Sequence, residues 1–285
     1  MVENTNPLTK YYRQPSIYIS LPTKGKYYNS GVIEPTTTGE LPVLAMTAKD
    51  EMAFKTPDAL MNGQATVDVI KSCIPNIKDP WQLVNYDIDT VLLGIRIATY
   101  GETMDITTTV PVIKEEMTHS VNLVALLETL KDKEFLDVLT TNDGFKIKLK
   151  PLTYKDITDT QIKTFKEQRT VSSITQSQIS EDQKTQMYAD SFKKLTQYNF
   201  DMLIDGVESI TTPDNEEVTD KKQIIEFLEN AESKRVEEIQ SGLILLRNQA
   251  ALKPIKINCT EDQIKRGAPV SFESPITFDN ANFFV

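Results

Sequence analysis

The sequence predicts an α+β protein, because segments with a strand-like pattern and segments with a helical pattern occupy different parts of the chain. Apolar and polar residues alternate in residues 16–20, and further β-like segments occur in 103–150 and 254–285. Helical spacing of apolar residues and helix-capping residues dominate the stretches 46–101 and 153–253. We therefore expect an N-terminal β-containing arm, a helical body, a small β region in the middle and a β-like C-terminal tail.

This pattern divides the chain of 285 residues into four parts. They are an extended β arm at 1–45, an α+β domain at 46–152, a helical domain at 153–253 and a β-like tail at 254–285. In the arm, Ile17 alternates with polar neighbours in SIYISLP, and a turn at TKG precedes a second short strand in LPVLAM. Proline cannot continue a helix, and the arm carries several: Pro7, Pro15, Pro22, Pro35 and Pro42.

Capping residues predict the helices that follow the arm. Thr47 caps a short helix in AKDEMAF, and Pro57 fits the first position of another helix in PDALMN. Residues 64–74 and 88–99 have the apolar spacing of helices. Asp87 is the expected N-cap of the latter helix, and Gly101 ends it.

The second half of the chain is expected to be mostly helical after a β region. MDITTTVPVI, HSVNLV and GFKIKLKPL read as strands, with a turn at 142–144. Thr153 and Asp156 form a capping box, and Ser180 caps a long helix that extends to about Ile204. Between these helices SSITQSQIS is predicted to be a mobile link, and Thr219 is predicted to open one long helix that extends to Leu246.

Composition excludes several functional classes. The chain has 31 Lys and Arg against 41 Asp and Glu, and this net charge of -10 argues against binding of bare nucleic acid. It has no apolar run of membrane-spanning length and no secretory signal at its start. Cys73 and Cys259 stand far apart, so a disulfide framework is not expected.

The residues needed for catalysis or metal binding are scarce. His119 is the only histidine and has no nearby cysteine or nucleophile loop. Ser191 and Lys194 match S-x-x-K, but without the companion motifs of acyl-transfer enzymes. We therefore expect no catalytic residue, no cofactor and no bound metal.

The stretch LPTKGKYY at 21–28 raises a separate question, because a Gly-Lys pair can end a phosphate-binding loop. Such a loop needs a glycine five residues before the pair and a Ser or Thr after it, and here Ser20 and Tyr27 stand at those positions. The stretch is therefore a turn that carries two aromatic residues. Tyr27 and Tyr28 either belong to the edge of the core or anchor a partner protein.

Several short motifs, taken in order, resemble one protein family. The chain reads LPTKGKYY at 21–28, LPVLAMTAKDEMAF at 41–54, CIPNI at 73–77 and LLGIRIATYG at 92–101. This order resembles the baseplate hub and hub-assembly proteins of contractile-tailed bacteriophages of the T-even type. The resemblance is best over residues 17–130. The matching residues include Met46, Thr47, Asp50, Glu51, Ile95, Arg96, Thr99, Tyr100, Gly101, Phe283 and Phe284.

The chain departs from this family pattern at two places. Many relatives carry Cys-x-x-Cys pairs after the Tyr-Gly motif and again near the C-terminus, which implies a metal-bound knuckle. Here the first place reads TVPVIKEEMTH without cysteine, and at the second Asp262 stands where a partner for Cys259 would be. Either the metal support is lost or packing has replaced it, and we expect no metal.

The resemblance also directs attention to Arg96 and Tyr100, which lie four residues apart and so share one helix face. Arg96 either lies beside Tyr100, pairs with an acid such as Glu102, or is a buried pin whose guanidinium satisfies several carbonyl groups. We favour the pin because the surrounding stripe is apolar, and we assign a structural role to Arg96, Tyr100 and Gly101.

The resemblance implies a structural or assembly component of a phage tail baseplate, acting in the hub by protein–protein interaction. It would belong to a multi-subunit assembly with other tail proteins in the virion, formed in the host cytoplasm, and would bind neither nucleic acid nor membrane. The alternatives are a transient hub-assembly chaperone that is absent from the finished virion and, more remotely, a hydrolytic enzyme. The expected partner-binding residues are Pro22, Lys24, Gly25, Tyr27, Tyr28, Phe283 and Phe284.

Overall fold

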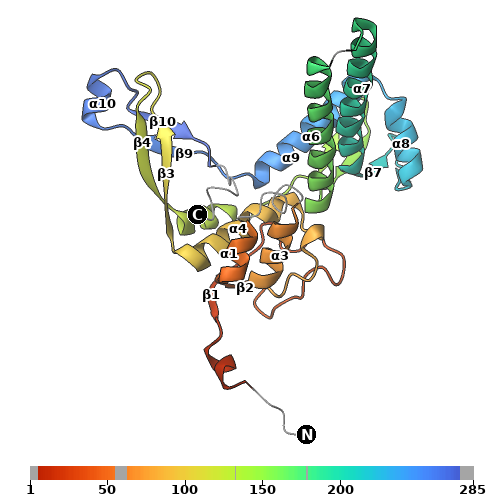
Figure 1. The fold of residues 1–285 in the computed structure, drawn as a ribbon. Coiled ribbons are helices and arrows are strands. Elements are labelled where there is room, and N and C mark those ends of the chain that lie inside the picture. The colour runs from red at the N-terminus through yellow and green to blue at the C-terminus, as the bar shows by residue number, and fades with distance from the viewer. Residues whose placement is uncertain (1–5, 55–62, 132, 178, 277–285) are drawn as a thin grey trace.

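The computed structural model describes residues 6–54, 63–131, 133–177 and 179–276, and it confirms the α+β fold. Figure 1 shows a central body from which three parts project. One is the N-terminal segment with the short helix η1 (Pro7–Tyr11), and another is the pair of long helices α6 (Tyr154–Gln176) and α7 (Glu181–Asp205). The third is a lobe that contains β3 (Thr103–Thr109) and β4 (Glu116–Asn122).

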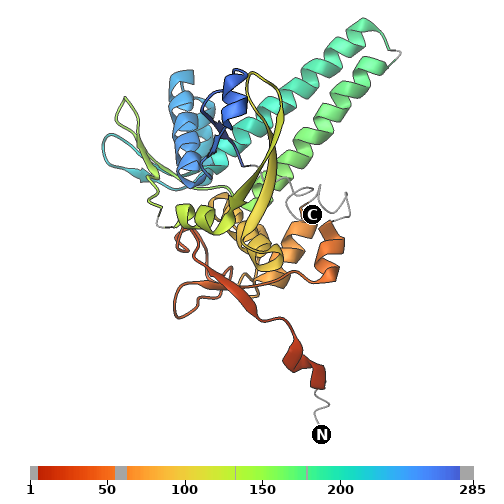
Figure 2. The ribbon, with the colours of Figure 1, turned by 90° about the vertical axis from the view of Figure 1, so that its left-hand side faces the viewer.

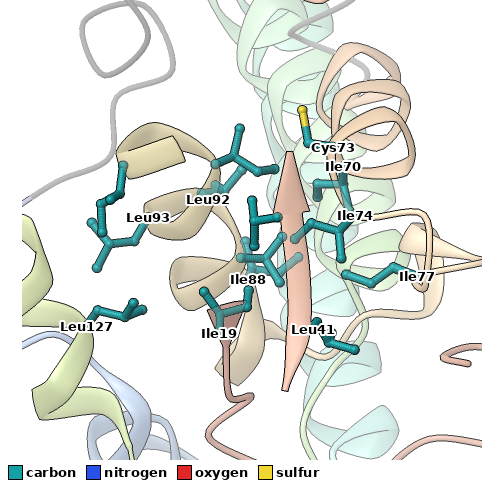
Figure 3. Packing of buried hydrophobic residues seen from close by; sticks show 14 of the residues in the cluster. Ile19, Leu41, Ile70, Cys73, Ile74, Ile77, Ile88, Leu92, Leu93 and Leu127 are labelled. Atoms are coloured by element: carbon teal, nitrogen blue, oxygen red, sulfur yellow. The ribbon is translucent and has the colours of Figure 1, made fainter. Parts of the chain in front are cut away.

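A first hydrophobic core lies between a small hairpin and a set of helices. Strand β1 (Pro15–Ile19) pairs antiparallel with β2 (Leu41–Leu44), and both strands pack on α4 (Asn85–Tyr100). The remaining elements of this core region are α1 (Ala48–Phe54), α3 (Gln64–Cys73), η2 (Pro80–Gln82) and α5 (Leu123–Leu130). Figure 3 shows Ile19 and Leu41 of the hairpin in one cluster with Ile70 of α3, Ile74 just after α3 and Ile88 of α4. The predicted strands in the arm and the predicted helix at 64–74 are therefore confirmed.

Close approach of β1 to α4 depends on Gly94. A Cβ atom at this position would lie 2.8 Å from Ile19 Cγ2, so no larger residue fits without movement of the strand or the helix. Ile19 and Val43 are fully buried at this contact. The N-terminal arm thus ends in a strand that belongs to the core of the body.

A second core covers one face of a four-stranded antiparallel sheet. Its strands lie in the order β5 (Val138–Thr140), β6 (Lys146–Leu149), β7 (Val207–Thr211) and β8 (Glu217–Val218). Residues of α7, α8 (Lys221–Glu229) and α9 (Ser233–Ala250) pack on it. The turn at 142–144 joins β5 to β6 as predicted, and Gly144 supplies the left-handed conformation there with φ 89°.

The long helices begin at the predicted residues. Thr153 and Asp156 form a reciprocal capping box at the start of α6, and Ser180 and Gln183 form another at the start of α7. The two helices pack antiparallel and extend away from the body, as Figure 2 shows from the side. Glu167 is buried between them and pairs with Lys194, Nζ to Oε1 at 3.1 Å.

The projecting β lobe joins two segments that are far apart in the sequence. The β3–β4 hairpin lies beside β9 (Ile255–Asn258), α10 (Glu261–Lys265) and β10 (Ser271–Ser274). Arg266 pairs with Glu115 of the hairpin loop, Nη2 to Oε2 at 2.6 Å, and Val110 at the end of β3 is fully buried. The β-like C-terminal tail is therefore a small hairpin with a helical turn, as far as residue 276.

Two expectations about helix starts were wrong. Helix α4 begins at Asn85, before the expected N-cap, and Asp87 is buried in its first turn. Asp87 binds a segment 64 residues away in sequence instead, and local capping rules cannot detect such a contact. The long helix expected from Thr219 is two helices, α8 and α9, because the Asn230 side chain donates to the carbonyl of Glu226 and ends α8.

Two further expectations differ from the structure in extent. Residues 123–130, expected within a β region, form α5, because Asn122 caps its start and leucine favours helix. Residues 172–176, expected in a mobile link, continue α6. The helix predicted for PDALMN lies outside the described residues. No helix in the described part of the chain is long and apolar enough to cross a membrane.

Candidate functional site

The turn of LPTKGKYY lies between the two cores. Leu21, Pro22 and Thr23 are buried, whereas Lys24 and Gly25 are exposed. Lys24 and Gly25 adopt left-handed backbone conformations, with φ 51° and 83°, so the chain reverses direction at this point. After the reversal, the side chains of Tyr27 and Tyr28 pack back against the body.

A buried carboxylate holds one end of this turn. Asp87 is fully buried on α4, and its Oδ1 accepts the backbone N–H of Thr23 at 3.0 Å. Its Oδ2 accepts the hydroxyls of Thr23 at 2.5 Å and of Tyr28 at 2.6 Å. Burial raises the pKa of Asp87, and the hydrogen bonds from Thr23 and Tyr28 oppose that shift. Within the described residues no cation pairs with this carboxylate, so neutral donors alone support it.

A second carboxylate holds the other side of the turn. Asp137, just before β5, accepts Lys26 Nζ at 2.6 Å and the Tyr27 hydroxyl at 3.2 Å. Burial by itself would raise the pKa of Asp137, but the hydrogen bond and charge of Lys26, with the Tyr27 hydroxyl, outweigh burial and lower it. Consecutive side chains of the turn therefore bind carboxylates from two distant segments.

Aromatic packing completes the connection between the cores. The ring of Tyr27 meets Tyr86 and Phe135 edge-on, with centroids 6.5 and 6.3 Å away. Tyr86 and Phe135 stack on one another at 5.2 Å. Tyr28 packs against both cores, and Tyr27 against the second. We call residues Thr23–Tyr28 together with Asp87 and Asp137 the core clamp, because they tie the first core to the second.

The expected partner-binding residues have different environments. Pro22 is buried, Lys24 and Gly25 are exposed, and Tyr27 and Tyr28 are half-buried in contacts within the chain. Phe283 and Phe284 lie outside the described residues. A cavity of about 690 Å³ lies beside the exposed part of the turn, lined in part by Lys24, Gly25 and Ile33. Partner binding by these residues stays a prediction.

Arg96 is buried, with 8% of its surface exposed, and its guanidinium lies 4.5 Å from the ring centre of Tyr100. Its Nε and Nη1 have no hydrogen-bond partner among the described residues, so no carbonyl there accepts from those two atoms. Gly101 ends α4 with φ 95°, and its N–H donates to the carbonyl of Ile97 at 3.0 Å. The structural role assigned to Arg96, Tyr100 and Gly101 stays a prediction.

Arg13, which no sequence motif marks, makes contacts of the kind expected of Arg96. Arg13 donates through Nη1 to the carbonyl of Ala45, and through Nη2 to the carbonyl and hydroxyl of Ser72, both at 2.7 Å. It also pairs with Asp50, Nη1 to Oδ2 at 3.5 Å. Arg13 thereby fixes the N-terminal segment to the body. Its place in a segment rich in turn residues gave no periodic signal.

The residues considered for catalysis lie on different elements of the structure and do not form one site. His119 is half-buried on β4 opposite Ile106, and Ser191 is buried between α6 and α7. Segments 109–119 and 259–266 come together in the β lobe, where the ion pair of Glu115 and Arg266 joins them. Among the described residues no group of three or more His, Cys, Asp or Glu is arranged to hold a metal.

Large apolar side chains are exposed on the projecting parts and on α9. On the N-terminal segment Leu8, Tyr11 and Tyr12 are 61%, 74% and 58% exposed. No residue of η1 is buried. Phe192 on α7 and Leu245 on α9 are 58% and 63% exposed. Exposed aromatic and apolar residues on projecting elements are typical of protein-binding surfaces.

A family model described as T4 bacteriophage base plate protein matches residues 15–272, which span both cores and the core clamp. Searches of curated proteins and of solved structures gave no match to this chain. The match covers most of the chain and agrees with the resemblance carried by the motifs between Leu21 and Gly101. The chain therefore belongs to the T4 bacteriophage base plate protein family, whose members are structural components of the phage tail baseplate.

Proposed function

We propose that this chain is a subunit of the baseplate hub and acts by binding other tail proteins. The observation that carries the proposal is the family match over residues 15–272. The core clamp joins the two cores into one body, and the N-terminal segment and α7 carry exposed apolar side chains that would meet neighbouring subunits. A scaffold with such projections suits a part that must contact several subunits in a defined geometry.

We further propose that the exposed side of the LPTKGKYY turn belongs to the binding surface. Lys24 and Gly25 would lie on its rim, and Pro22, Tyr27 and Tyr28 would support it from inside the chain, with Phe283 and Phe284 as a second anchor. The cavity beside Lys24 and Gly25 supports this proposal, because it offers apolar atoms next to the turn.

In this proposal the chain has no catalytic centre, cofactor or metal, and the single histidine supports that part. Its partners are proteins, not nucleic acid or membrane, and the net charge of -10 argues against nucleic acid. Assembly would take place in the host cytoplasm. Stoichiometric zinc in purified protein would contradict the absence of metal, and loss of a hydrolytic activity on His119→Ala would contradict the absence of catalysis.

The test is complementation of a phage that lacks the gene. The null phage should produce no complete baseplates by electron microscopy, and the wild-type chain should restore them. Antibody labelling should then place the chain on the central axis of the baseplate. Labelling at the periphery would contradict the hub, and complete baseplates without the chain would contradict a structural function.

A further inference from the structure

One edge of the four-stranded sheet is open. Strand β5 stands at the end of the order β5–β6–β7–β8, and among the described strands it pairs only with β6. The carbonyl of Asp137 and the N–H of Thr141 both form hydrogen bonds across to the β6 side. Because such bonds recur at every second residue of an antiparallel pair, the backbone groups of Val138 and Thr140 point away from β6. We call the N–H and C=O groups of Val138 and Thr140 the open edge.

Helix α9 closes both ends of this edge but not its middle. The N–H of Leu136 donates to Oε1 of Gln249 at 3.0 Å. The N–H of Asn142 donates to Oε2 of Glu238 at 3.2 Å. The open edge lies between these two contacts, and its groups form no hydrogen bond with any described residue. The ends of the edge are therefore fixed, while two donors and two acceptors in its middle stay available.

Exposed apolar side chains flank the open edge. Leu136 and Val138 are 76% and 55% exposed, and they share one face because side chains alternate along an extended chain. Leu245 on α9 is 63% exposed, and helical spacing places it on the same helix face as Glu238 and Gln249, which reach the edge. Strand β5 contains neither proline nor lysine and has no bulge, the devices that commonly protect a sheet edge.

An extended chain matches the chemistry of the open edge. The free groups of Val138 and Thr140 repeat about 6.8 Å apart, since a strand rises about 3.4 Å per residue. A second strand presents its own N–H and C=O groups at the same spacing, whereas a helix uses its backbone groups internally. The side chains of an added strand would also cover Val138, which water does not do. The edge therefore favours a strand as its partner.

We propose that an extended segment of another baseplate protein adds to β5 as a fifth strand and bonds the open edge. The proposal rests on the proposed function, because it takes the partner from the same assembly. A second copy of this chain fits less well, because two strands of three residues would bury far less than the roughly 1,200 Å² of a stable interface. A different subunit that other baseplate contacts hold nearby can bind through a short strand, since its effective concentration is high.

The test removes one backbone donor from the open edge. Val138→Pro lacks the outward N–H, and proline is tolerated where the N–H of an edge strand faces solvent. Val138→Thr is the matched control, because it keeps the N–H and a β-branched side chain. Each variant is expressed in cells infected with the null phage, and the chain in purified baseplates is measured by quantitative mass spectrometry.

The two variants should behave differently. Val138→Pro should lower incorporation at least about tenfold, because a carbonyl of the partner strand loses its donor and stays unpaired in the interface. Val138→Thr should remain within about twofold of wild type. Equal incorporation of the two variants would overturn the added strand.

Hydrogen exchange tests the same groups in the wild-type chain, so it does not depend on the folding of the proline variant. The N–H groups of Val138 and Thr140 should exchange at least about tenfold more slowly in assembled baseplates than in the free chain. The N–H of Leu139, which faces β6 in both states, is the internal reference. Unchanged exchange at positions 138 and 140 would overturn the proposal.

The partner is identified by a photo-crosslinking amino acid at position 140 in infected cells, with the linked peptide sequenced. The proposal expects a segment of another tail protein. A link to a second copy of this chain would overturn it. Wild-type chain absent from all baseplates would instead refute the proposed function itself.

Discussion

Removal of one hydroxyl group in the core clamp should destabilise the whole protein. In Tyr28→Phe, Asp87 loses a donor at 2.6 Å and the N–H of Val84 loses its acceptor at 3.2 Å. A hydrogen bond to a charged group contributes about 1.5–3 kcal/mol, and a buried group left unpaired adds to that loss. We expect the free energy of unfolding to fall by about 2–3 kcal/mol.

The control is the neighbouring residue with the same chemical change. Tyr27→Phe removes a longer hydrogen bond, of 3.2 Å, from the hydroxyl to Asp137. Asp137 still accepts the hydrogen bond of Lys26 Nζ at 2.6 Å in this variant. We expect a loss below about 1 kcal/mol there. Urea unfolding followed by fluorescence of the single tryptophan, Trp81, measures both. With an m-value of about 3 kcal/mol per M, the midpoint of Tyr28→Phe should fall by about 0.7–1 M.

The pH dependence of this loss provides a second check. The folded-state pKa of Asp87 is raised, so the folded protein holds that proton more tightly than the unfolded chain, and stability is lost as pH rises through the folded pKa. The Tyr28 hydroxyl mainly supports the charged carboxylate. The effect of Tyr28→Phe should therefore grow from pH 4 toward pH 8. A loss that equals that of Tyr27→Phe, or that shrinks with rising pH, would refute the role given to Asp87.

Three further outcomes follow from individual contacts. Gly94→Ala should lower stability by about 1–2 kcal/mol, since overpacking against Ile19 exceeds the gain in helix propensity, and a more stable variant in urea would contradict this. Arg13→Ala should free the N-terminal segment, seen as faster hydrogen exchange there while the cores keep their protection; unchanged exchange would show that other contacts suffice. Lys26→Ala removes the cation that holds the pKa of Asp137 down, so the advantage of wild type should disappear as pH falls through that pKa, and a constant difference in stability down to pH 2 would exclude this pairing.

Local signals in the sequence predicted local structure well. The capping pairs at Thr153 and Ser180 act between neighbouring residues, and both helices begin there. The alternation around Ile17 likewise identified β1. Such patterns need no knowledge of the rest of the chain, which is why they succeeded.

Contacts between distant segments could not be predicted in the same way. Asp87 has the sequence context of a helix cap, and its bond to Thr23 depends on how β1 lies against α4. Arg13 meets Ser72 across 59 residues for a similar reason. The motifs of the family directed attention to the LPTKGKYY turn, and its function in partner binding stays a prediction. Its contacts with Asp87 and Asp137 became visible only once both cores were placed. The four-part division of the chain stays a prediction.

The most direct test of the account is the amount of this chain in finished virions. Particles purified through two density gradients, with intact baseplates confirmed by electron microscopy, would be analysed by quantitative mass spectrometry against known tail proteins. A structural hub subunit predicts a fixed whole-number ratio to the other baseplate proteins in infectious particles. A chain found in assembly intermediates but absent from finished virions would contradict the account and identify a transient assembly chaperone instead.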